Sequence, residues 1–396
     1  MDITIYPRSL RGEISIIPSK SMAHRMFICA AFADKPTQII CPESNRDMDA
    51  TADCLRALGA EILRTETGFT VFPVKTVPQK AVLPCGESGS TLRFLLPVAG
   101  ALGVDATFRM EGRLPQRPLS PLWEEMQHMG CCLSRPGPDT LRCTGKLTPG
   151  AYSIPGNVSS QYITGLLLAL SLLPEKSSLE VTGRLESKPY IDMTRAVLTE
   201  FGVDPEQPGG QTLHSPGYLT VEGDWSNGAF WLAAAMLGSD IALSGLNHRS
   251  CQGDRAVMDI LPMLEAGCPT LSAADIPDLV PILSVVAAVK NGGVFSDIRR
   301  LRLKESDRVA SVIAMIEALG GTAWASDNTL TIAGTGLTGG TVDACNDHRI
   351  AMAAAIAATV CKQPVTVLGA ECVSKSYPRF WEEYSRLGGN YEQYLR

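Results

Sequence analysis

Long hydrophobic runs are absent from this chain of 396 residues. No segment approaches the roughly 18 consecutive apolar residues that a membrane helix needs. Residues Met1 to Arg11 alternate like a strand, with charges at both ends, and they lack the apolar centre of a signal peptide. We therefore expect a cytoplasmic protein that does not use a membrane as its partner.

Metal-ligand and disulfide patterns are also missing. The five histidines never stand in pairs at ligand spacing, and none of the twelve cysteines forms a C-x-x-C pair. The cysteines run from Cys29 to Cys372 through apolar segments, so we interpret them as small buried residues in a reducing cytoplasm. The sequence predicts no metal site and no disulfide framework.

Positive charge is scarce, with 35 Lys and Arg against 41 Asp and Glu and a net charge of -6. This balance argues against nucleic acid or an anionic membrane as the main partner. Any basic site must therefore be local.

Nucleotide-binding loops are not supported either. The stretch "GTGLTG" at Gly334–Gly339 matches G-x-G-x-x-G, but strand-like residues follow it where a helix is needed. We interpret it as a hairpin turn. The stretch "GESGST" at Gly86–Thr91 lacks the lysine of a Walker loop.

What the sequence does contain is a repeat of two kinds of helix. One kind has apolar residues at helical spacing and closes on a glycine, at Gly59, Gly130, Gly202, Gly267, Gly320 and Gly388. The other kind is apolar nearly all round and opens on a polar cluster, beginning at Ser19, Gly86, Val158, Asp224, Ile276 and Asn346. Between the helices lie short β-branched runs that predict strands, such as "TQII", "GFTVFP", "SLEVTG", "YLTVEG", "TLTIAG" and "PVTVLG".

The alternation predicts an α/β protein of six repeated units. Three units in each of two domains divide the chain near Val221–Asp224, and the N-terminal strand joins the second half. If the six buried helices run parallel, their N-termini, with free N–H groups and positive dipole ends, face the same way. Two such domains facing each other would form a cleft suited to phosphates and carboxylates.

Cations recur in the polar clusters at the predicted helix starts. A cation in the first turn opposes the helix dipole, so its recurrence indicates an anionic ligand. Simpler interpretations stay open for several of these residues. Ser19, Ser21, Ser159, Ser160, Ser187 and Ser306 could be N-caps, Asp278 could cap a helix, His348 could be a hydrogen-bonded structural group, and Lys304 to Arg308 could form salt bridges within one helical turn.

Eleven motifs, in their order along the chain, resemble those of the 5-enolpyruvylshikimate-3-phosphate synthase family, whose members are 3-phosphoshikimate 1-carboxyvinyltransferases. They are "SKSMAHR", "CGESGSTLRF", "RPLSPL", "NVSSQYITGLLLA", "ESKPYIDMT", "VEGDWS", "QGD", "IPDL", "LKESDR", "NDHRIAM" and "SKSYPRF". The resemblance covers nearly the whole chain. It implies a two-domain inside-out α/β barrel of six βαβαββ-type units, three per domain, with parallel helices whose N-termini point at the interdomain cleft. The implied domains are 1–17 plus 223–396 and the inserted 18–222, with a hinge near 17–19 and 221–224.

The resemblance also implies a reaction: the enolpyruvyl group of phosphoenolpyruvate passes to the 5-hydroxyl of shikimate 3-phosphate, and phosphate is released. By position, the shikimate 3-phosphate ligands are Lys20, Ser21, Arg25, Ser159, Ser160, Gln161, Ser187, Tyr190, Asp278 and Lys304. The phosphoenolpyruvate ligands are Lys20, Gly89, Arg117, Gln161, Arg308, Arg349 and Lys375. The family further implies small-molecule substrates, no metal or organic cofactor, and a monomer.

The reaction requires acid–base chemistry, because the 5-hydroxyl loses a proton and C3 of phosphoenolpyruvate gains one before phosphate leaves. Our hypothesis is that Asp278 assists the deprotonation, while Lys20 and Glu305 handle the proton at C3 and at the departing phosphate. Cations around the carboxylate stabilise the charge that develops there.

Four positions depart from the family pattern or affect inhibition. Glu87 and Arg300 stand where many or some relatives have Asn, and Phe94 stands where proline is frequent. Gly89 leaves room beside phosphoenolpyruvate, so the resemblance predicts inhibition by glyphosate.

Two alternatives stay open. One is the enolpyruvyl transferase that acts on UDP-N-acetylglucosamine, although the loop Glu111–Arg117 lacks the cysteine usual in that family. The other is a non-catalytic anion-binding relative, although Asp278, Glu305 and Lys20 are all present.

Overall fold

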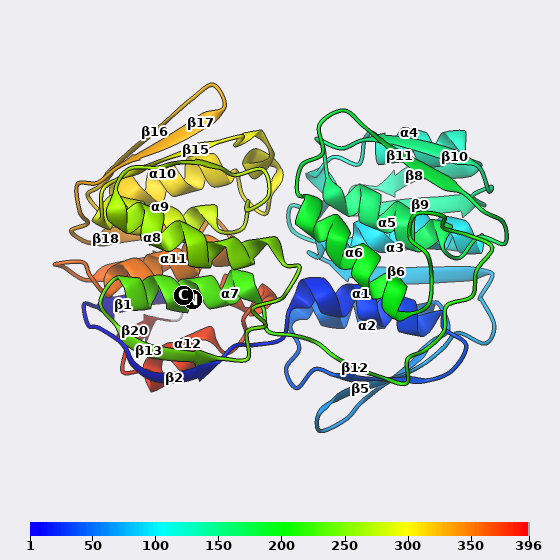
Figure 1. The fold of residues 1–396 in the computed structure, drawn as a ribbon, viewed down its shortest axis with the longest axis horizontal. Helices are drawn as coiled ribbons and strands as arrows, with labels where there is room; N and C mark the ends of the chain where they lie inside the picture. The colour runs from blue at the N-terminus through cyan, green and yellow to red at the C-terminus, as the bar shows by residue number, and fades with distance from the viewer. Residues whose placement is uncertain (395–396) are drawn as a thin grey trace. The chain divides into compact units, whose positions relative to one another are not determined.

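The computed structural model describes residues 1–394, and the chain divides into two compact units (Figure 1). The terminal unit consists of Met1–Ile17 and the residues from Gly223 onward, and the inserted unit is Pro18–Glu222. At one end of the inserted unit the backbone N–H of Ser19 donates to the carbonyl of Glu222 over 2.8 Å. In the terminal unit, the N–H of Asp224 donates to the carbonyl of Ile17 over 2.9 Å. A backbone hydrogen bond therefore joins the start of the inserted unit to its end, and another joins the two segments of the terminal unit that flank the insertion.

The inserted unit contains two four-stranded sheets built on one pattern. The first has the order β12 (Tyr218–Thr220), β3 (Thr37–Ile40), β5 (Gly68–Phe72), β4 (Glu61–Arg64), and the second has the order β6 (Lys80–Gly86), β7 (Asp105–Met110), β9 (Thr140–Gly145), β8 (Cys131–Gly137). In both, one parallel pair is followed by two antiparallel pairs. A separate parallel pair joins β10 (Ala151–Pro155) and β11 (Ser178–Thr182).

The terminal unit has the same pairing pattern. Its four-stranded sheets have the orders β14 (Thr270–Ser272), β15 (Gly293–Ser296), β17 (Thr329–Ala333), β16 (Thr322–Ser326), and β18 (Gly340–Asp343), β19 (Val365–Leu368), β1 (Asp2–Tyr6), β20 (Asn390–Tyr394). Each again has one parallel and two antiparallel pairs. The separate parallel pair is β2 (Arg11–Ser15) with β13 (Asp240–Ser244). The N-terminal segment therefore forms two strands of this unit, where the sequence predicted one strand over Met1 to Arg11.

Helices of two kinds alternate in both units. Those buried nearly all round are α1 (Lys20–Ala31), α3 (Gly89–Leu102), α5 (Ser160–Leu170), α7 (Trp225–Met236), α9 (Val280–Val289) and α11 (His348–Ala358). Those with an exposed side are α2 (Arg46–Ala57), α4 (Leu122–His128), α6 (Lys188–Glu200), α8 (Val257–Ala266), α10 (Arg308–Ala318) and α12 (Phe380–Arg386). Short 3₁₀ turns are η1 (Leu114–Gln116), η2 (Gly253–Ala256), η3 (Arg299–Leu303) and η4 (Ala370–Lys375).

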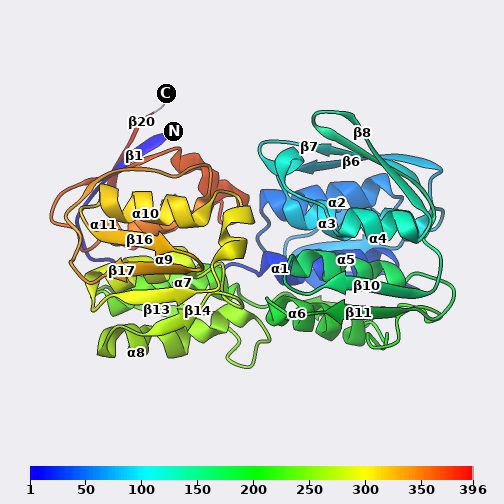
Figure 2. The ribbon, with the colours of Figure 1, turned by 90° about the horizontal axis from the view of Figure 1, so that it is seen from above.

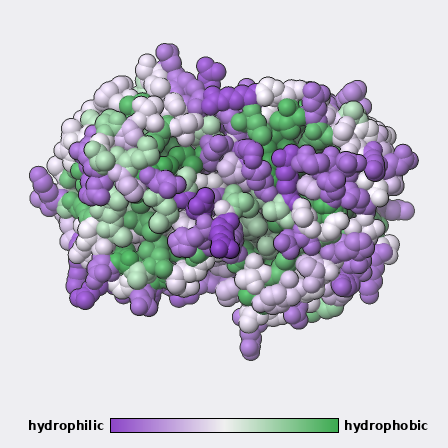
Figure 3. Space-filling view, viewed as in Figure 1, coloured by the Kyte–Doolittle hydropathy of each residue, from purple (hydrophilic) through white to green (hydrophobic). Residues whose placement is uncertain are grey.

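The apolar helices form the cores. In the inserted unit α3 packs against α5, and Figure 2 shows α2 and α3 alongside β6 and β7. In the terminal unit α11 packs against α9 and α7. Hydrophilic residues cover much of the face drawn in Figure 3, whereas almost every residue of α9 and α11 is buried.

The six glycines of the sequence repeat each follow the end of a helix, and five of them have a left-handed φ between +76° and +106°. Gly267 differs, because its φ of 177° is extended backbone that any residue adopts.

Two expectations were wrong. The stretch "GTGLTG" is no hairpin turn, since it joins β17 and β18, which belong to different sheets. The cysteines are not all buried: eight are, but Cys132, Cys251, Cys268 and Cys345 are exposed, because they lie on the outer side of β8 or in connecting segments. All twelve lie in the described part of the chain and are free thiols.

The contact of α5 with α3 depends on Gly165. A Cβ atom at this position would lie 2.2 Å from the backbone carbonyl oxygen of Arg93, which cannot rotate away. We expect Gly165→Ala to lower the free energy of unfolding by about 1–3 kcal/mol through overpacking, measured by urea denaturation. Gly267→Ala is the matched control, because a Cβ there meets open space and its φ is extended. Equal stability of the two variants would contradict this account of the packing.

Candidate functional site

In the inserted unit, side chains near the starts of several helices bond to one another. Lys20, the first residue of α1, forms an ion pair of 2.9 Å with Asp47 in the first turn of α2. Thr51 of α2 and Thr91 of α3 share a hydrogen bond of 2.6 Å. These contacts require α1, α2 and α3 to begin at the same end of the unit.

Arg25 lies at the same end and is buried, with 2% of its surface exposed. Its guanidinium donates to neutral oxygens of α1, α5 and α6: the carbonyls of Ser21 and Tyr190 and the hydroxyls of Thr164 and Thr194. Its plane also faces the ring of Phe94 at 5.0 Å from the centroid. The guanidinium is therefore fixed by three helices at once.

Gly89, Arg93, Arg117 and Gln161 lie together where α3 and α5 begin. A Cβ on Gly89 would be 2.6 Å from Nη1 of Arg93 and 2.7 Å from Nη1 of Arg117. Arg93 Nη1 donates to Gln161 Oε1 over 3.2 Å, and Gln161 Nε2 donates to the Ser90 hydroxyl over 3.0 Å. We call the residues Lys20, Arg25, Gly89, Arg93, Arg117 and Gln161 the Arg25 cluster.

The serines before these helices have different roles. Ser159 caps α5, because its hydroxyl accepts from the backbone N–H of Gln161, and Ser160 is buried in the first turn. Ser187 stands before α6 with a φ of +56° and makes no side-chain cap bond. Ser19 occupies the N-cap position of α1, but its hydroxyl makes no cap bond and is buried without a partner among the described residues. The interpretation that the side chains of Ser19 and Ser187 cap helices was therefore wrong.

Asp278 is the centre of a second group of charges, in the terminal unit. Its Oδ1 accepts from Nη1 of Arg308 over 2.6 Å and its Oδ2 from Nη2 of Arg349 over 3.0 Å, and Lys304 Nζ lies 3.5 Å from Oδ1. Burial by itself would raise the pKa of Asp278, but the charges of Arg349, Lys304 and Arg308 outweigh it and hold the pKa well below the usual value. Asp278 is not a helix cap, because Leu279 occupies the cap position of α9.

Arg308 is fully buried and binds three carboxylates. Besides Asp278, its Nε donates to Asp347 over 2.9 Å and its Nη2 to Glu305 over 2.7 Å. Burial opposes the charge of Arg308, but these carboxylates, Asp347 first, raise its pKa well above the usual value. Asp278, Lys304, Glu305, Arg308, Asp347 and Arg349 form what we call the Asp278 cluster.

The sequence suggested that Lys304 to Arg308 lie within one helical turn, and this expectation was wrong. The side chain of Asp307 caps α10 by accepting from the N–H groups of Val309 and Ala310, so the helix begins only at Arg308. Ser306 is therefore no cap either, and its hydroxyl donates to Asp347. The expected i,i+3 ion pair does form between Glu305 and Arg308.

Lys304 and Lys375 complete the cations of the terminal unit. Burial lowers the pKa of Lys304 to about 8, with Asp278 acting in the opposite direction and Arg308 adding to the decrease. Lys375, at the end of η4, donates from Nζ to the carbonyl of Asn346 over 2.9 Å. Asn346 immediately precedes Asp347, the cap of α11, so Lys375 lies at the start of that helix.

The predicted site residues thus fall into two groups, one in each unit. Those of the inserted unit are Lys20, Ser21, Arg25, Gly89, Arg117, Ser159, Ser160, Gln161, Ser187 and Tyr190, and those of the terminal unit are Asp278, Lys304, Glu305, Arg308, Arg349 and Lys375. Sequence reasoning missed partners that hold them, namely Asp47, Ser226 and Asp347. Asp347 could have been found, because an acid directly before a basic helix start is a typical N-cap.

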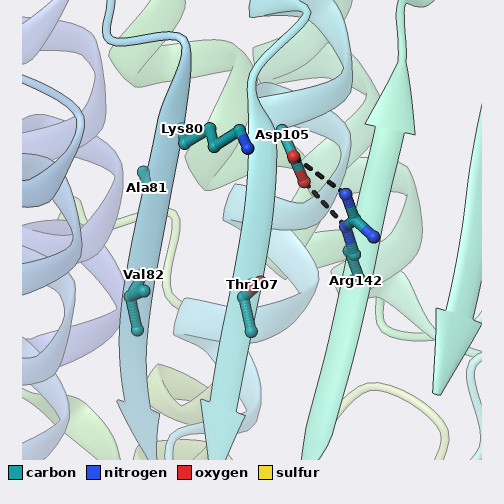
Figure 4. A pocket seen from close by; sticks show the side chains of 6 residues that line it. All are labelled: Lys80, Ala81, Val82, Asp105, Thr107 and Arg142. Carbon is teal, nitrogen blue, oxygen red and sulfur yellow. Dashed lines mark hydrogen bonds and ion pairs between the residues drawn. The ribbon is translucent and has the colours of Figure 1, made fainter. Parts of the chain in front are cut away.

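A surface pocket of about 290 Å³ lies elsewhere in the inserted unit, on β6, β7 and β9. Figure 4 shows its lining residues, in which Arg142 forms two hydrogen bonds with Asp105. None of the predicted site residues lines it. Within residues 1–394 no group of His, Cys, Asp and Glu is arranged to hold a metal ion, and no helix there is long and apolar enough to span a bilayer.

Comparison with known proteins places the chain among enolpyruvyl transferases. The family model described as "EPSP synthase (3-phosphoshikimate 1-carboxyvinyltransferase)" matches residues 6–384. The 3-phosphoshikimate 1-carboxyvinyltransferase of Clostridium acetobutylicum is 37% identical, over 99% of this chain and 98% of that protein. The enzyme of the same name from Clostridioides difficile is 35% identical, over 99% of this chain and 98% of that protein.

Solved structures agree on the fold. EPSP synthase from Acinetobacter baumannii has a TM-score of 0.80 and 22% identity, covering 99% of this chain and 100% of that chain. The enolpyruvyl transferase NikO from Streptomyces tendae has a TM-score of 0.75 and 18% identity, covering 99% of this chain and 98% of that chain. Because the family model and the clostridial relatives both extend over nearly the whole sequence, the chain belongs to the EPSP synthase (3-phosphoshikimate 1-carboxyvinyltransferase) family.

Proposed function

We propose that this chain transfers the 1-carboxyvinyl group of phosphoenolpyruvate to the 5-hydroxyl of shikimate 3-phosphate and releases inorganic phosphate. The observation that carries this proposal is the identity of 35–37% to clostridial enzymes with this name over nearly their full length. The reaction belongs to the shikimate pathway. Both substrates are small molecules that carry a phosphate and a carboxylate, which suits two clusters of lysine and arginine at helix starts.

The finer architecture is also part of the proposal. We propose a two-domain inside-out α/β barrel of six repeated units, with domains 1–17 plus 223–396 and 18–222 and a hinge near 17–19 and 221–224. The recurrence of one pairing order in four sheets supports the repeat. We further propose that the chain acts as a monomer in the cytoplasm and binds no nucleic acid, in line with its net charge of -6.

The substrate contacts follow the family pattern. Shikimate 3-phosphate is assigned to Lys20, Ser21, Arg25, Ser159, Ser160, Gln161, Ser187, Tyr190, Asp278 and Lys304. Phosphoenolpyruvate is assigned to Lys20, Gly89, Arg117, Gln161, Arg308, Arg349 and Lys375. Arg117 supports this assignment, because its Nε is buried and has no hydrogen-bond partner among the described residues. A buried donor without a partner is costly, and an anionic ligand would satisfy it.

The proposed chemistry is an addition followed by an elimination. The oxygen of the 5-hydroxyl bonds to C2 of phosphoenolpyruvate as C3 takes up a proton; then the C2–O bond to phosphate breaks and C3 loses a proton. Asp278 accepts the hydroxyl proton, and Lys20 and Glu305 transfer protons at C3 and at the leaving phosphate. The steps neither oxidise nor reduce the substrates, so the proposal needs no metal or organic cofactor. The depressed pKa of Asp278 keeps its carboxylate ionised, so that it can accept a hydrogen bond from the hydroxyl, and it also makes the carboxylate a weaker base than an ordinary aspartate.

The choice of acceptor tests the reaction. Phosphate release from phosphoenolpyruvate is expected with shikimate 3-phosphate and not with UDP-N-acetylglucosamine, because the loop Glu111–Arg117 lacks the cysteine of the latter family. Glyphosate should reduce the release. Release that occurs only with the sugar nucleotide would assign the chain to the other transferase, and tight binding of both substrates without any release would indicate a non-catalytic relative.

Asp278→Asn tests the base. The amide keeps the shape of the side chain but cannot accept a proton, so we expect kcat to fall by about 10²–10⁴-fold. Because the variant also removes a charge that offsets Arg308 and Arg349, folding should be checked by circular dichroism and substrate binding by calorimetry. Asp275→Asn, an exposed change three residues away, is the control. Near-normal turnover with unchanged binding would show that Asp278 is not the base.

Asp254, in η2, gives the terminal unit a pH-dependent stability. Burial and then the carboxylate of Asp278 raise the pKa of Asp254 to about 7; Asp224 acts in the same direction, and Arg349 and Lys304 act against it. The folded chain therefore keeps a proton that the unfolded chain loses from about pH 4 upward. Stability contributed by this proton is lost as the pH rises from about 4 to about 7.

Asp254→Asn should remove this loss. We expect the variant to gain stability relative to the parent chain as the pH rises from 5 to 8, measured as the midpoint of urea unfolding at each pH. Asp259→Asn, an exposed change on the adjacent α8, is the matched control for the loss of one carboxylate. A constant difference between Asp254→Asn and the parent would contradict the raised pKa.

A further inference from the structure

We propose that Asn227, in the first turn of α7, is a positioning residue that holds Lys375 in place through Ser376. The inference rests on the proposed function, in which Lys375 binds phosphoenolpyruvate. Asn227 Nδ2 donates to the Ser376 hydroxyl over 3.3 Å, and both side chains are buried, with 1% and 0% of their surface exposed. Ser376 directly follows Lys375 and ends η4.

Asn227 is itself held by the cap of its helix. Its backbone N–H donates to Oδ1 of Asp224 over 2.9 Å, and the Ser226 hydroxyl donates to the same oxygen over 2.6 Å. The Ser226 oxygen in turn accepts from Nη2 of Arg349 over 3.0 Å. One helix cap therefore fixes the Ser226 hydroxyl, which accepts from Arg349, and the backbone of Asn227, whose side chain bonds to the residue that follows Lys375.

A purely structural role explains Asn227 poorly. Its Oδ1 is buried and has no hydrogen-bond partner among the described residues. A half-satisfied amide is more costly in a core than an apolar side chain of similar size. Local costs of this kind are expected where a side chain serves a site. An asparagine can form the hydrogen bond to Ser376, and an apolar residue cannot.

The contact bears on Lys375 in particular. Lys375 is 8% exposed and its ammonium already donates to the Asn346 carbonyl over 2.9 Å. Without the bond to Ser376, the end of η4 gains freedom, and the ammonium spends less time in the position that an anionic group needs. Shikimate 3-phosphate is not assigned to Lys375, so its binding should be less affected.

The test compares Asn227→Ala, Ser376→Ala and the double variant. Removal of one hydrogen bond should raise the KM for phosphoenolpyruvate about 3–10-fold, while the KM for shikimate 3-phosphate changes less than about two-fold. The KM of the double variant for phosphoenolpyruvate should be no higher than that of either single variant, because both substitutions remove the same hydrogen bond. Additive effects, or equal increases in both KM values, would overturn the proposal.

Trp231→Phe is the matched control for lost stability. Trp231 lies one turn further along α7, is equally buried, and its Nε1 has no hydrogen-bond partner among the described residues. The change removes volume from the same region without touching Ser376, so the KM for phosphoenolpyruvate should stay within about two-fold of the parent value. An increase equal to that of Asn227→Ala would show that loose packing, and not the bond, affects Lys375.

A second measurement does not depend on turnover. Acetylation of Lys375 by acetic anhydride can be followed by peptide mass spectrometry, with the exposed Lys362 as internal reference. Relative to Lys362, Lys375 should react at least about three-fold faster in Asn227→Ala and Ser376→Ala than in the parent or in Trp231→Phe. Unchanged reactivity would overturn the proposal even if the chain were inactive with shikimate 3-phosphate, whereas inactivity with altered reactivity would refute only the proposed function.

Discussion

Burial of guanidinium groups at the positive ends of helices is the constraint on which the terminal unit depends. Arg308 begins α10 and Arg349 stands second in α11, so each cation lies where the helix dipole disfavours it, and both are buried. Desolvation adds to the cost. Asp278 and Asp347 offset both effects by direct ion pairs, and Asp347 also caps α11. The carboxylates therefore hold the cations in the fold before any substrate is present.

In the inserted unit, neutral groups orient two buried arginines, while Lys20 pairs with the acid Asp47. Arg25 donates to hydroxyl and carbonyl oxygens of three helices, and Arg93 donates to the side chain of Gln161 and to the carbonyl of Pro118. Hydrogen bonds of this kind fix the orientation of a guanidinium without neutralising it. Neutral oxygens therefore help to orient Arg25 and Arg93, whereas in the terminal unit acids pair directly with Arg308 and Arg349.

The helices could be predicted from the sequence, whereas the contacts between their side chains could not. Six apolar helices and six glycine-ended helices could be found, because helical spacing and the left-handed preference of glycine act over a few residues. The bonds of Asp278 to Arg349 and Arg308 join residues 71 and 30 positions apart, which no local pattern encodes. Local patterns predicted the wrong role where such long-range contacts form. Asp278 pairs with cations and does not occupy a helix-cap position. Ser306 bonds to Asp347, while Asp307 caps α10.

The balance of charge around Lys304 follows from the same constraint. In the absence of substrate its pKa of about 8 reflects burial first, then the opposing charges of Asp278 and Arg308. Under the proposed function Lys304 binds shikimate 3-phosphate, and an anion bound there would add negative charge beside the lysine and so raise its pKa. A pKa raised further above neutral pH would keep the ammonium charged while the anion is bound. The Asp278 cluster is balanced in charge: Asp278, Glu305 and Asp347 stand against Lys304, Arg308 and Arg349, so the acids that allow these cations to be buried match them in number.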